Sequence, residues 1–215
     1  MNLSYLVTCH NETDSLDKLL SKLCEFKNDQ QEIVLLDDNS TEEKTLDIIE
    51  KYKNNIQYHR KQLEKHYGKH KNYGIEKCEG KWIFQIDADE YPTDTLAQHI
   101  DLIIEQNNEN EVLWIPRLNV FHGVTNTDIQ TWGWKYDGKY INFPDYQSRL
   151  YRNLPHIRYQ RRLHEKVEGF KSYSFMPPQE KYALVHEKTI EKQRATNIRY
   201  NQWFTQEENK GYNVK

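Results

Sequence analysis

The sequence predicts an α/β protein built on a doubly wound, mostly parallel sheet. Over the first 116 of the 215 residues, short apolar segments alternate with amphipathic segments, as strands joined by crossover helices require. Three of the apolar segments end in polar residues. Because ligands of such sheets bind outside the carboxyl ends of the strands, we expect a site at that edge.

The strands and helices of this first part are placed by the spacing of apolar residues. Continuous apolar runs predict strands, and apolar residues three or four apart predict helices. The predicted strands cover residues 3–8, 33–36, 56–59 and 81–86, and the predicted helices cover residues 16–26, 66–78 and 96–104, with another helix beginning at Thr41. Ser40 or Thr41 is the expected N-cap of that helix, because a hydroxyl can accept a hydrogen bond from the first turn.

The pattern changes after the first 116 residues. Strands are predicted at residues 112–115, 118–121 and 182–186, and a polar terminal helix at residues 189–204. Residues 122–144 lack periodicity and predict a long loop, which in a compact domain usually has a function. Five aromatic residues there support a function: Trp132, Trp134, Tyr136, Tyr140 and Phe143. We therefore divide one continuous domain into an α/β half, residues 1–116, and a second half, residues 117–215.

Composition narrows the classes of partner and location. The formal net charge is −3, so no overall basic field favours nucleic acid as a partner. The three cysteines, Cys9, Cys24 and Cys78, lack metal-ligand spacing and are interpreted as reduced thiols of a cytoplasmic protein. No apolar run reaches the ~18 residues needed to span a bilayer. We expect a soluble chain without an export signal, and peripheral contact with a membrane stays open.

Three predicted strand ends carry polar residues, namely Thr8 to Glu12, Asp37 to Ser40, and Asp87 to Glu90. A single acidic strand end is a weak signal, because Asp and Asn are common in turns. Three in succession, the last with an Asp-x-Asp pattern, favour a functional site. Asp38 follows a fully apolar strand, and it could accept a hydrogen bond from a nucleobase N–H or cap the next helix; the residues alone leave both roles open.

Asp87 and Asp89 are two residues apart, so their side chains would share one face of an extended strand. Beyond the strand end they can converge on Mn²⁺ or Mg²⁺, hard cations that prefer oxygen ligands and bridge phosphate oxygens. A cation there would neutralise the charge that builds on a departing diphosphate.

These segments resemble the successive signatures of glycosyltransferase family 2. The signatures are Thr8 to Glu12, Leu36 to Ser40 and Glu79 to Glu90, with Lys69 to Asn72 at the place of a basic-Asn pair. The Asp-Ala-Asp-Glu ending at Glu90 and several later segments are similar to the subgroup that includes lipopolysaccharide-core glucosyltransferases. Those later segments are Trp114 to Arg117, Pro144-Asp145, Arg149-Leu150, His164-Glu165 and His186. Asn39 stands where the family often has Gly, and Asn tolerates the left-handed backbone of such a turn.

The resemblance implies a GT-A fold and an inverting transfer of a sugar from a nucleoside-diphosphate donor, with UDP as the expected nucleotide. The acceptor would be a hydroxyl of a glycan, a lipid-linked glycan or another molecule. The nucleotide site would be lined by Thr8, Asn11, Glu12, Asp38 and Lys71. Asp89 would be the main metal ligand, and Asp87 would contact the ribose or the metal.

The general base must reach the acceptor hydroxyl, so we expect it from the second half of the chain. Glu165 and Asp145 are the candidates, and Glu165 is preferred because the His-Glu pair recurs in the subgroup that the chain resembles. His186 follows a predicted strand as Asp87 follows Ile86, and a neutral imidazole is a good Mn²⁺ ligand, so we expect it in the metal shell or at the diphosphate.

Two other functions stay open. One is a nucleotidyltransferase, although the Gly-rich phosphate loop usual after the first strand of such enzymes is replaced here by Thr8 to Glu12. The other is a non-catalytic carbohydrate-binding protein, which crowded acidic groups without a cation disfavour.

Overall fold

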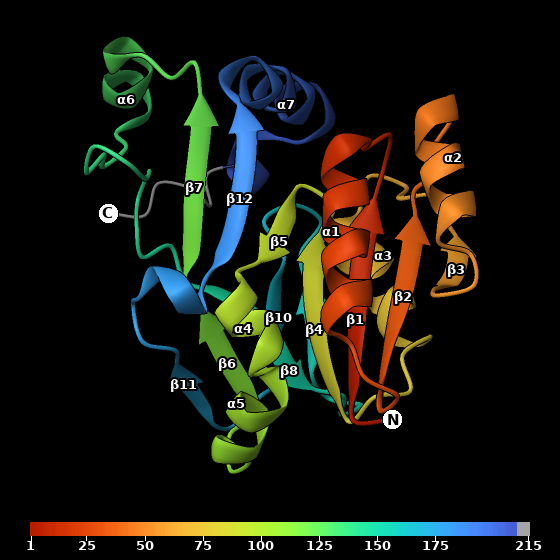
Figure 1. The fold of residues 1–215 in the computed structure, drawn as a ribbon. Helices are drawn as coiled ribbons and strands as arrows, with labels where there is room; N and C mark the ends of the chain where they lie inside the picture. Colours follow the sequence, from red (N-terminus) through yellow and green to blue (C-terminus); the bar gives the residue numbers. More distant parts are fainter. Residues whose placement is uncertain (210–215) are drawn as a thin grey trace.

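A seven-stranded, largely parallel sheet forms the centre of the computed structural model, which describes residues 1–209. Its strand order is β11-β6-β8-β4-β1-β2-β3, and only β8 runs antiparallel to its neighbours. The strands are β1 (Leu3–Cys9), β2 (Gln31–Asp37), β3 (Gln57–Arg60), β4 (Trp82–Asp87), β6 (Val112–Ile115), β8 (Gln147–Arg152) and β11 (Tyr173–Phe175). The arrowheads of β1, β2 and β4 point toward the same edge of the sheet (Figure 1). The α/β class with a largely parallel sheet is thus confirmed.

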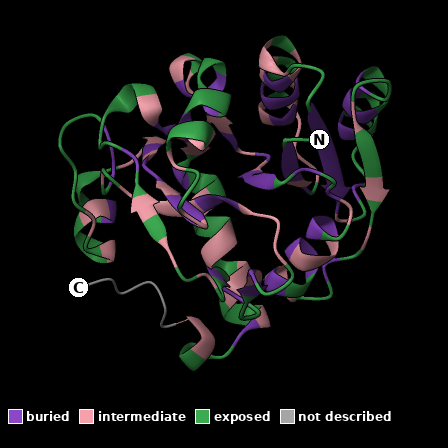
Figure 2. Cartoon of the chain, turned by 90° about the horizontal axis from the view of Figure 1, so that it is seen from below, coloured by how far each residue is buried: buried purple, intermediate pink, exposed green. Residues whose placement is uncertain are grey.

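Each face of this sheet packs a different layer. The larger core joins the sheet to α1 (Asp14–Phe26), α2 (Glu43–Lys51), α4 (Asp94–Gln98) and α5 (Ile100–Gln106). On the other face, a second core joins it to α3 (Tyr67–Ile75) and to the hairpin of β9 (Arg158–Gln160) and β10 (Lys166–Glu168). Figure 2 shows buried strands inside and helices whose outer surfaces are exposed. The apolar stripes of the helices therefore face the sheet, as their spacing predicts.

A three-stranded sheet stands beyond the carboxyl edge of the large one. It consists of β5 (Glu90–Pro92), β12 (Leu184–Thr189) and β7 (Arg117–His122), with β12 in the middle. Helix α7 (Ile190–Trp203) follows β12 directly and lies over the edge in Figure 1. The remaining helices are α6 (Asn126–Trp132), the 3-10 helix η1 (Glu180–Tyr182) and α8 (Gln206–Asn209). Within residues 1–209, no helix is both long and apolar enough to cross a bilayer.

Most predicted elements are confirmed within two or three residues. The main exceptions concern length and continuity. The helix expected at residues 96–104 is two short helices, α4 and α5, which meet at His99. The strand expected at residues 182–186 begins at Leu184, because Tyr182 belongs to η1. Strands β8 to β11 had no counterpart in the prediction, although β8 lies between β4 and β6 in the central sheet.

Two local predictions were wrong. Residues 122–144 contain α6, which begins with a capping box between Thr125 and Asp128, and Ile141 pairs with Asn119 of β7. The segment is therefore more ordered than a long loop. The N-cap of α2 is Glu42, without a side-chain cap. Asn11 instead accepts hydrogen bonds from the backbone N–H groups of Thr41 and Glu42, at 2.8 and 3.1 Å, and so serves the helix from another segment.

Candidate functional site

The three predicted strand ends meet at one edge of the sheet. Thr8 at the end of β1 is paired with Asp87 at the end of β4, and its hydroxyl donates to Asp87 Oδ1 at 2.8 Å. Cys9 is paired with Asp37 at the end of β2. Asn39, in the turn after β2, has the left-handed φ of 48° that its side chain tolerates. The parallel register therefore brings the expected segments together.

Asp87 belongs to a buried charge network on the α3 face. Its Oδ1 lies 3.0 Å from Lys71 Nζ, and its Oδ2 lies 2.6 Å from an Arg149 nitrogen. Burial raises the pKa of the Asp87 carboxyl, but Arg149 and Lys71 outweigh this effect and hold its pKa well below the usual value. Asp87 is therefore an anion whose two oxygens already contact cations, which suits an organising role between strands.

Lys71 connects this network to Glu165. Its ammonium lies 2.7 Å from Glu165 Oε1, and although burial lowers the pKa of Lys71, Asp87 and Glu165 raise it above its ordinary value. Glu165 itself is mostly buried, with 15% of its side chain exposed. Within residues 1–209, no group donates a hydrogen bond to its second oxygen, Oε2. One carboxylate oxygen thus anchors Glu165 and the other is free to accept a proton.

The loop that carries Glu165 is held by the first turn of α3. The backbone N–H of Tyr67 donates to the carbonyl of Arg162 at 2.9 Å, and that of Gly68 donates to the carbonyl of Arg161 at 3.2 Å. A Cβ at Gly68 would lie only 2.5 Å from the Arg161 oxygen, so this close approach requires glycine. These contacts therefore hold the β9–β10 hairpin, and with it Glu165, in a fixed position relative to Lys71.

Asp145 lies in a different part of the network. Arg117 donates to its Oδ2 at 2.6 Å, Asn119 donates to the same oxygen at 2.9 Å, and Gln147 donates to Oδ1 at 2.9 Å. Arg117 also pairs with buried Glu90 at 2.9 Å. Burial raises the pKa of Asp145, but Arg117 and Asn119 lower it by more, so the pKa lies below its usual value. Both oxygens are occupied, which makes Asp145 a weaker candidate base than Glu165.

The depressed pKa of Asp145 predicts an acid-dependent loss of stability. Ionised Asp145 stabilises the fold above its unfolded pKa of about 3.9, and this contribution disappears as the pH falls through the lower folded pKa. We expect Asp145→Asn to reduce the free energy of unfolding by about 2 kcal/mol at pH 7. Urea unfolding should show this difference unchanged between pH 7 and about 5 and shrinking below about 4. Asp94→Asn, at an exposed carboxylate, is the control; a difference independent of pH would contradict the assignment.

Asp89 faces His186 rather than the Asp87 network. Its Oδ2 lies 3.4 Å from His186 Nε2, at the point where Glu90 of β5 pairs with His186 of β12. Burial raises the pKa of Asp89, yet His186 lowers it well below the usual value. Asp87 is close enough to act on Asp89 electrostatically, but the two carboxylates have separate partners.

Asn119 determines which nitrogen of His186 can bind a ligand. The Asn119 amide nitrogen donates to Ile141 O and Asp145 Oδ2, so its Oδ1 is the atom that faces His186 Nδ1 at 2.9 Å. His186 therefore carries hydrogen on Nδ1, and its Nε2 is the ring nitrogen that faces the Asp89 carboxylate. A carboxylate oxygen and an imidazole nitrogen are both suitable ligands for Mn²⁺, and an imidazole oriented by a carbonyl is the usual arrangement of a metal-binding histidine. Within residues 1–209, no cluster of three His, Cys, Asp or Glu side chains has metal-site geometry, so this pair would need ligands from a substrate.

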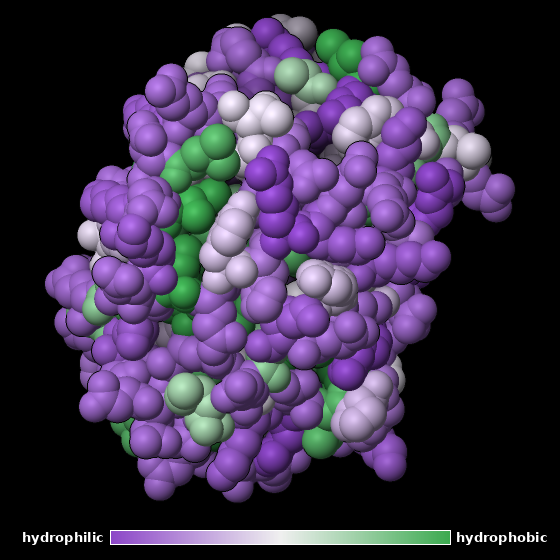
Figure 3. All heavy atoms as spheres, turned by 90° about the vertical axis from the view of Figure 1, so that its right-hand side faces the viewer, coloured by the Kyte–Doolittle hydropathy of each residue, from purple (hydrophilic) through white to green (hydrophobic). Residues whose placement is uncertain are grey.

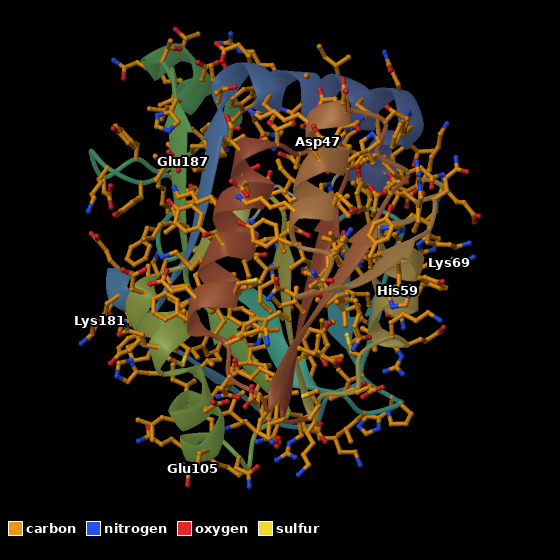
Figure 4. All side chains as sticks on the ribbon, turned by 45° about the vertical axis from the view of Figure 1, so that its right-hand side comes forward. Asp47, His59, Lys69, Glu105, Lys181 and Glu187 are labelled. Atoms are coloured by element: carbon orange, nitrogen blue, oxygen red, sulfur yellow. The ribbon has the colours of Figure 1, made fainter. Side chains whose placement is uncertain are left out.

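Basic groups line the approach to Asp89. Lys188 lies on the same face of β12 as His186, and burial lowers its pKa despite the neighbouring Asp89. Lys192 of α7 pairs with Glu12 at 2.5 Å. Further along α7, the ring of Tyr200 lies 6.0 Å from that of Tyr67 in α3. Figure 4 shows α7 running from the side of labelled Glu187 toward the side of labelled Lys69, over the strand ends.

A cavity of about 320 Å³ opens between the β3–α3 loop, the first turn of α3 and Arg162, and Asp38 reaches its wall through Leu63. The backbone N–H of Leu63, in its wall, donates to Asp38 Oδ1 at 2.7 Å. His70, also in the wall, is 6% exposed, and its Nδ1 is buried without a hydrogen-bond partner within residues 1–209. Burial lowers the pKa of His70, so a neutral ring faces the cavity. The cavity has the size of a small-molecule site, which is about 300–1,000 Å³.

The structure thus groups the predicted residues into three clusters. Asp87, Lys71, Thr8 and Glu165 form one, Asp89 and His186 form another, and Asp38 stands beside the cavity. Asp145 contacts none of these directly. Sequence reasoning gave no role to Gln85, Asn119 or Lys188, and it noted Arg117 and Arg149 only within a resemblance. Gln85 offered a signal, because it is a polar residue inside an otherwise apolar strand.

Residues 4–175 match the family model described as glycosyl transferase family 2. Among curated proteins, the chain is 29% identical over 118 residues, 53% of its length, to the poly(ribitol-phosphate) beta-N-acetylglucosaminyltransferase TarS of Staphylococcus aureus (strain Mu50), of which this covers 20%. It is also 29% identical over 89 residues, 40% of its length, to the poly-beta-1,6-N-acetyl-D-glucosamine synthase of Staphylococcus aureus (strain MSSA476), of which this covers 21%. The chain therefore spans about a fifth of the length of these relatives.

Solved structures of TarS from S. aureus share the fold. The 1–349 fragment superposes with a TM-score of 0.61 and 20% identity, covering 87% of this chain and 60% of the fragment. The same fragment in complex with UDP-GlcNAc gives a TM-score of 0.55 and 20% identity, covering 82% of this chain and 59% of that one. At this identity the likeness concerns the fold alone.

Proposed function

The chain belongs to glycosyl transferase family 2, and from this we propose that it transfers a sugar with inversion from a UDP-linked donor to a hydroxyl acceptor, with a divalent cation. The observation that carries the proposal is the pairing of Asp89 with His186 Nε2 beside the strand ends, because it places a carboxylate and an imidazole nitrogen, two kinds of metal ligand, next to each other. Asp89 and His186 would hold Mn²⁺ or Mg²⁺ together with diphosphate oxygens. When bound, the cation would neutralise the negative charge that builds on the departing diphosphate.

The remaining residues divide the work between binding and proton transfer. Lys188, close to Asp89, would contact the diphosphate, while Thr8, Asn11 and Glu12 border the nucleotide site. Glu165 would accept the proton of the acceptor hydroxyl on Oε2. The hydroxyl oxygen forms a bond to the anomeric carbon from the side opposite the diphosphate, the bond from that carbon to the diphosphate oxygen breaks, and UDP leaves. Lys71 keeps Glu165 oriented through its partner oxygen.

Uracil is the base that the Asp38 cavity fits best in this proposal. A carboxylate can accept a hydrogen bond from the N3–H of uracil. His70, in the cavity wall, has an Nδ1 atom without a hydrogen-bond partner within residues 1–209. The TarS complex with UDP-GlcNAc supports a UDP-sugar on this fold. Within the family, we propose the subgroup that includes lipopolysaccharide-core glucosyltransferases, which the segments from Trp114 to His186 resemble.

Calorimetry with UDP, GDP and ADP in the presence of Mn²⁺ tests the base assignment. We expect UDP to bind at least about tenfold more tightly than the other two, because a site built to pair with a donor rejects bases that leave it unpaired. Asp38→Asn keeps an oxygen for the Leu63 N–H but replaces the other with a donor that opposes uracil N3–H. It should remove the preference for UDP while preserving the melting temperature. Equal affinity of the wild type for all three nucleotides would refute the role of Asp38.

The family match favours sugar transfer over the nucleotidyltransferase alternative. A non-catalytic carbohydrate-binding protein is distinguished by its failure to release UDP from any UDP-sugar. The acceptor in our proposal is a hydroxyl of a glycan or lipid-linked glycan, which would bring the protein into peripheral contact with a membrane. A cytoplasmic location is proposed because Cys9, Cys24 and Cys78 are unpaired thiols.

A further inference from the structure

A row of aromatic rings leads away from His186. The ring of Phe121 lies 5.7 Å from that of His186, Trp134 lies 5.0 Å from Phe121, and Trp132 lies 4.6 Å from Trp134. We call Phe121, Trp134 and Trp132 the aromatic ledge. All three are half-buried, so part of each ring is accessible. The ledge therefore joins the site to the surface.

The ledge continues the face of the small sheet on which the site is built. Arg117, Asn119 and Phe121 alternate along β7 and share one face, and Lys188 of β12 is the register partner of Phe121. Charged and amide side chains occupy the part of this face near Asp145, and aromatic rings occupy the part beyond Asn119. A molecule that reaches the site along this face meets the rings first.

Core packing does not account for these rings. Within residues 1–209, no core cluster includes Phe121, Trp132 or Trp134, and none of the three packs against such a cluster. The small core at this end uses the opposite face of β7 and β12, with Leu118 and partly buried Val185. Two accessible tryptophans outside a core point to a ligand, because such rings offer a flat apolar face and a polar edge.

The ledge is fixed in place before any ligand binds. The capping box of Thr125 and Asp128 starts α6, and Arg194 of α7 pairs with Asp128 at 2.7 Å. Gly133 ends α6 with the left-handed φ of 63°, and the Trp134 N–H donates to the carbonyl of Ile129 at 2.9 Å. Both tryptophans are therefore held on a braced turn, and little ordering cost accompanies binding.

We propose that the aromatic ledge is a subsite for a pyranose ring of the acceptor, which makes the acceptor a carbohydrate chain rather than a small alcohol. One sugar ring of the acceptor lies on Trp134 and Trp132. The next sugar ring of the same chain lies toward Phe121 and presents the acceptor hydroxyl at the site. This proposal rests on the proposed function for the reaction, but binding of the carbohydrate is measurable without it. The face with α2 and β3 is largely hydrophilic apart from one apolar strip (Figure 3).

Tyr173 and Phe175 provide a matched control. They are the most exposed aromatic pair on one strand, at 56% and 51%, but they lie on edge strand β11, away from α6 (Figure 1). The ring of Phe175 contacts those of Trp114 and Tyr146, and the ring of Tyr173 contacts that of Phe170, so neither belongs to the ledge. Loss of two aromatic rings from the surface is therefore the same chemical change at a different place.

Calorimetry with the full chain, UDP and Mn²⁺ tests the ledge, with maltotriose, cellotriose and chitotriose as probes. We expect at least one trisaccharide to bind, and the double variant Trp132→Ala with Trp134→Ala to weaken it about tenfold or more while UDP affinity and melting temperature hold. Trp134→Tyr should restore most of the affinity, and the Tyr173→Ala, Phe175→Ala variant should bind as the wild type does. Wild type that binds none of the three, or equal binding by the ledge variant, overturns the proposal. The protein could also bind a trisaccharide through Trp134 and yet release no UDP from any donor. That result would support the ledge and reject the proposed reaction.

Discussion

Replacing Asp89 with Asn should lower sugar transfer by about 10³-fold, or ~4 kcal/mol of transition-state stabilisation. The carboxylate that faces His186 Nε2 disappears, and an amide is a far weaker ligand for a divalent cation. The fold should survive, because the backbone carbonyl of Asp89 still accepts from the Glu187 N–H at 3.3 Å. Initial rates of UDP release, measured against Mn²⁺ concentration, give the comparison.

Two further variants separate ligation from a general electrostatic effect. His186→Ala should weaken Mn²⁺-dependent UDP binding, because it removes the second atom of the pair, whereas Asp94→Asn, at an exposed carboxylate paired with Lys22, should behave as the wild type. Turnover of Asp89→Asn that equals the wild type, or wild-type activity that survives exhaustive chelation, would rule out a metal held here.

Replacing Glu165 with Gln should reduce kcat by about 10²- to 10⁴-fold, the usual range for loss of a general base. Gln keeps the shape of the side chain and an oxygen for Lys71, so donor binding and melting temperature should change little. The expected signature is a lower kcat at nearly constant KM for the donor, measured with the same acceptor. Release of UDP to water should fall less, because water needs less precise positioning than an acceptor hydroxyl.

Asp145→Asn provides the contrasting case. Its carboxylate already accepts from Arg117, Asn119 and Gln147, so its loss should act on stability and acceptor positioning more than on proton transfer. Near-normal turnover by Glu165→Gln together with a 10²-fold loss in Asp145→Asn would reverse the assignment of the base.

The first half of the fold could be predicted from sequence because its signals are local. Leu16, Leu19, Leu20 and Leu23 are at most 1% exposed, as their helical spacing predicts. Parallel strands such as β1 and β2 are buried on both faces, so they read as continuous apolar runs. Polar residues at the ends of such strands necessarily meet at one edge, which is why Thr8 and Asp87 were found together.

The second half resisted prediction because its signals depend on partners far along the chain. Strand β8 carries a buried Arg149 between Ser148 and Leu150, and only the carboxylates of Asp87 and Glu90 explain a buried guanidinium there. Asp87 and Asp89 were expected on one face, but β4 ends at Asp87, so the spacing rule for a strand no longer applies at Asp89. The role of Asn119 could not be inferred at all, since it follows from bonds to Ile141, Asp145 and His186.

Analysis of the products by NMR tests the central claim most directly. The wild-type chain is incubated with Mn²⁺ and each of several α-linked UDP-sugars, with and without trisaccharide acceptors. We expect metal-dependent release of UDP and, for at least one donor, a product in which the transferred sugar has the β configuration. Release of UMP and sugar phosphate, retention of the α configuration, or no UDP above the rate without protein for every donor would contradict it.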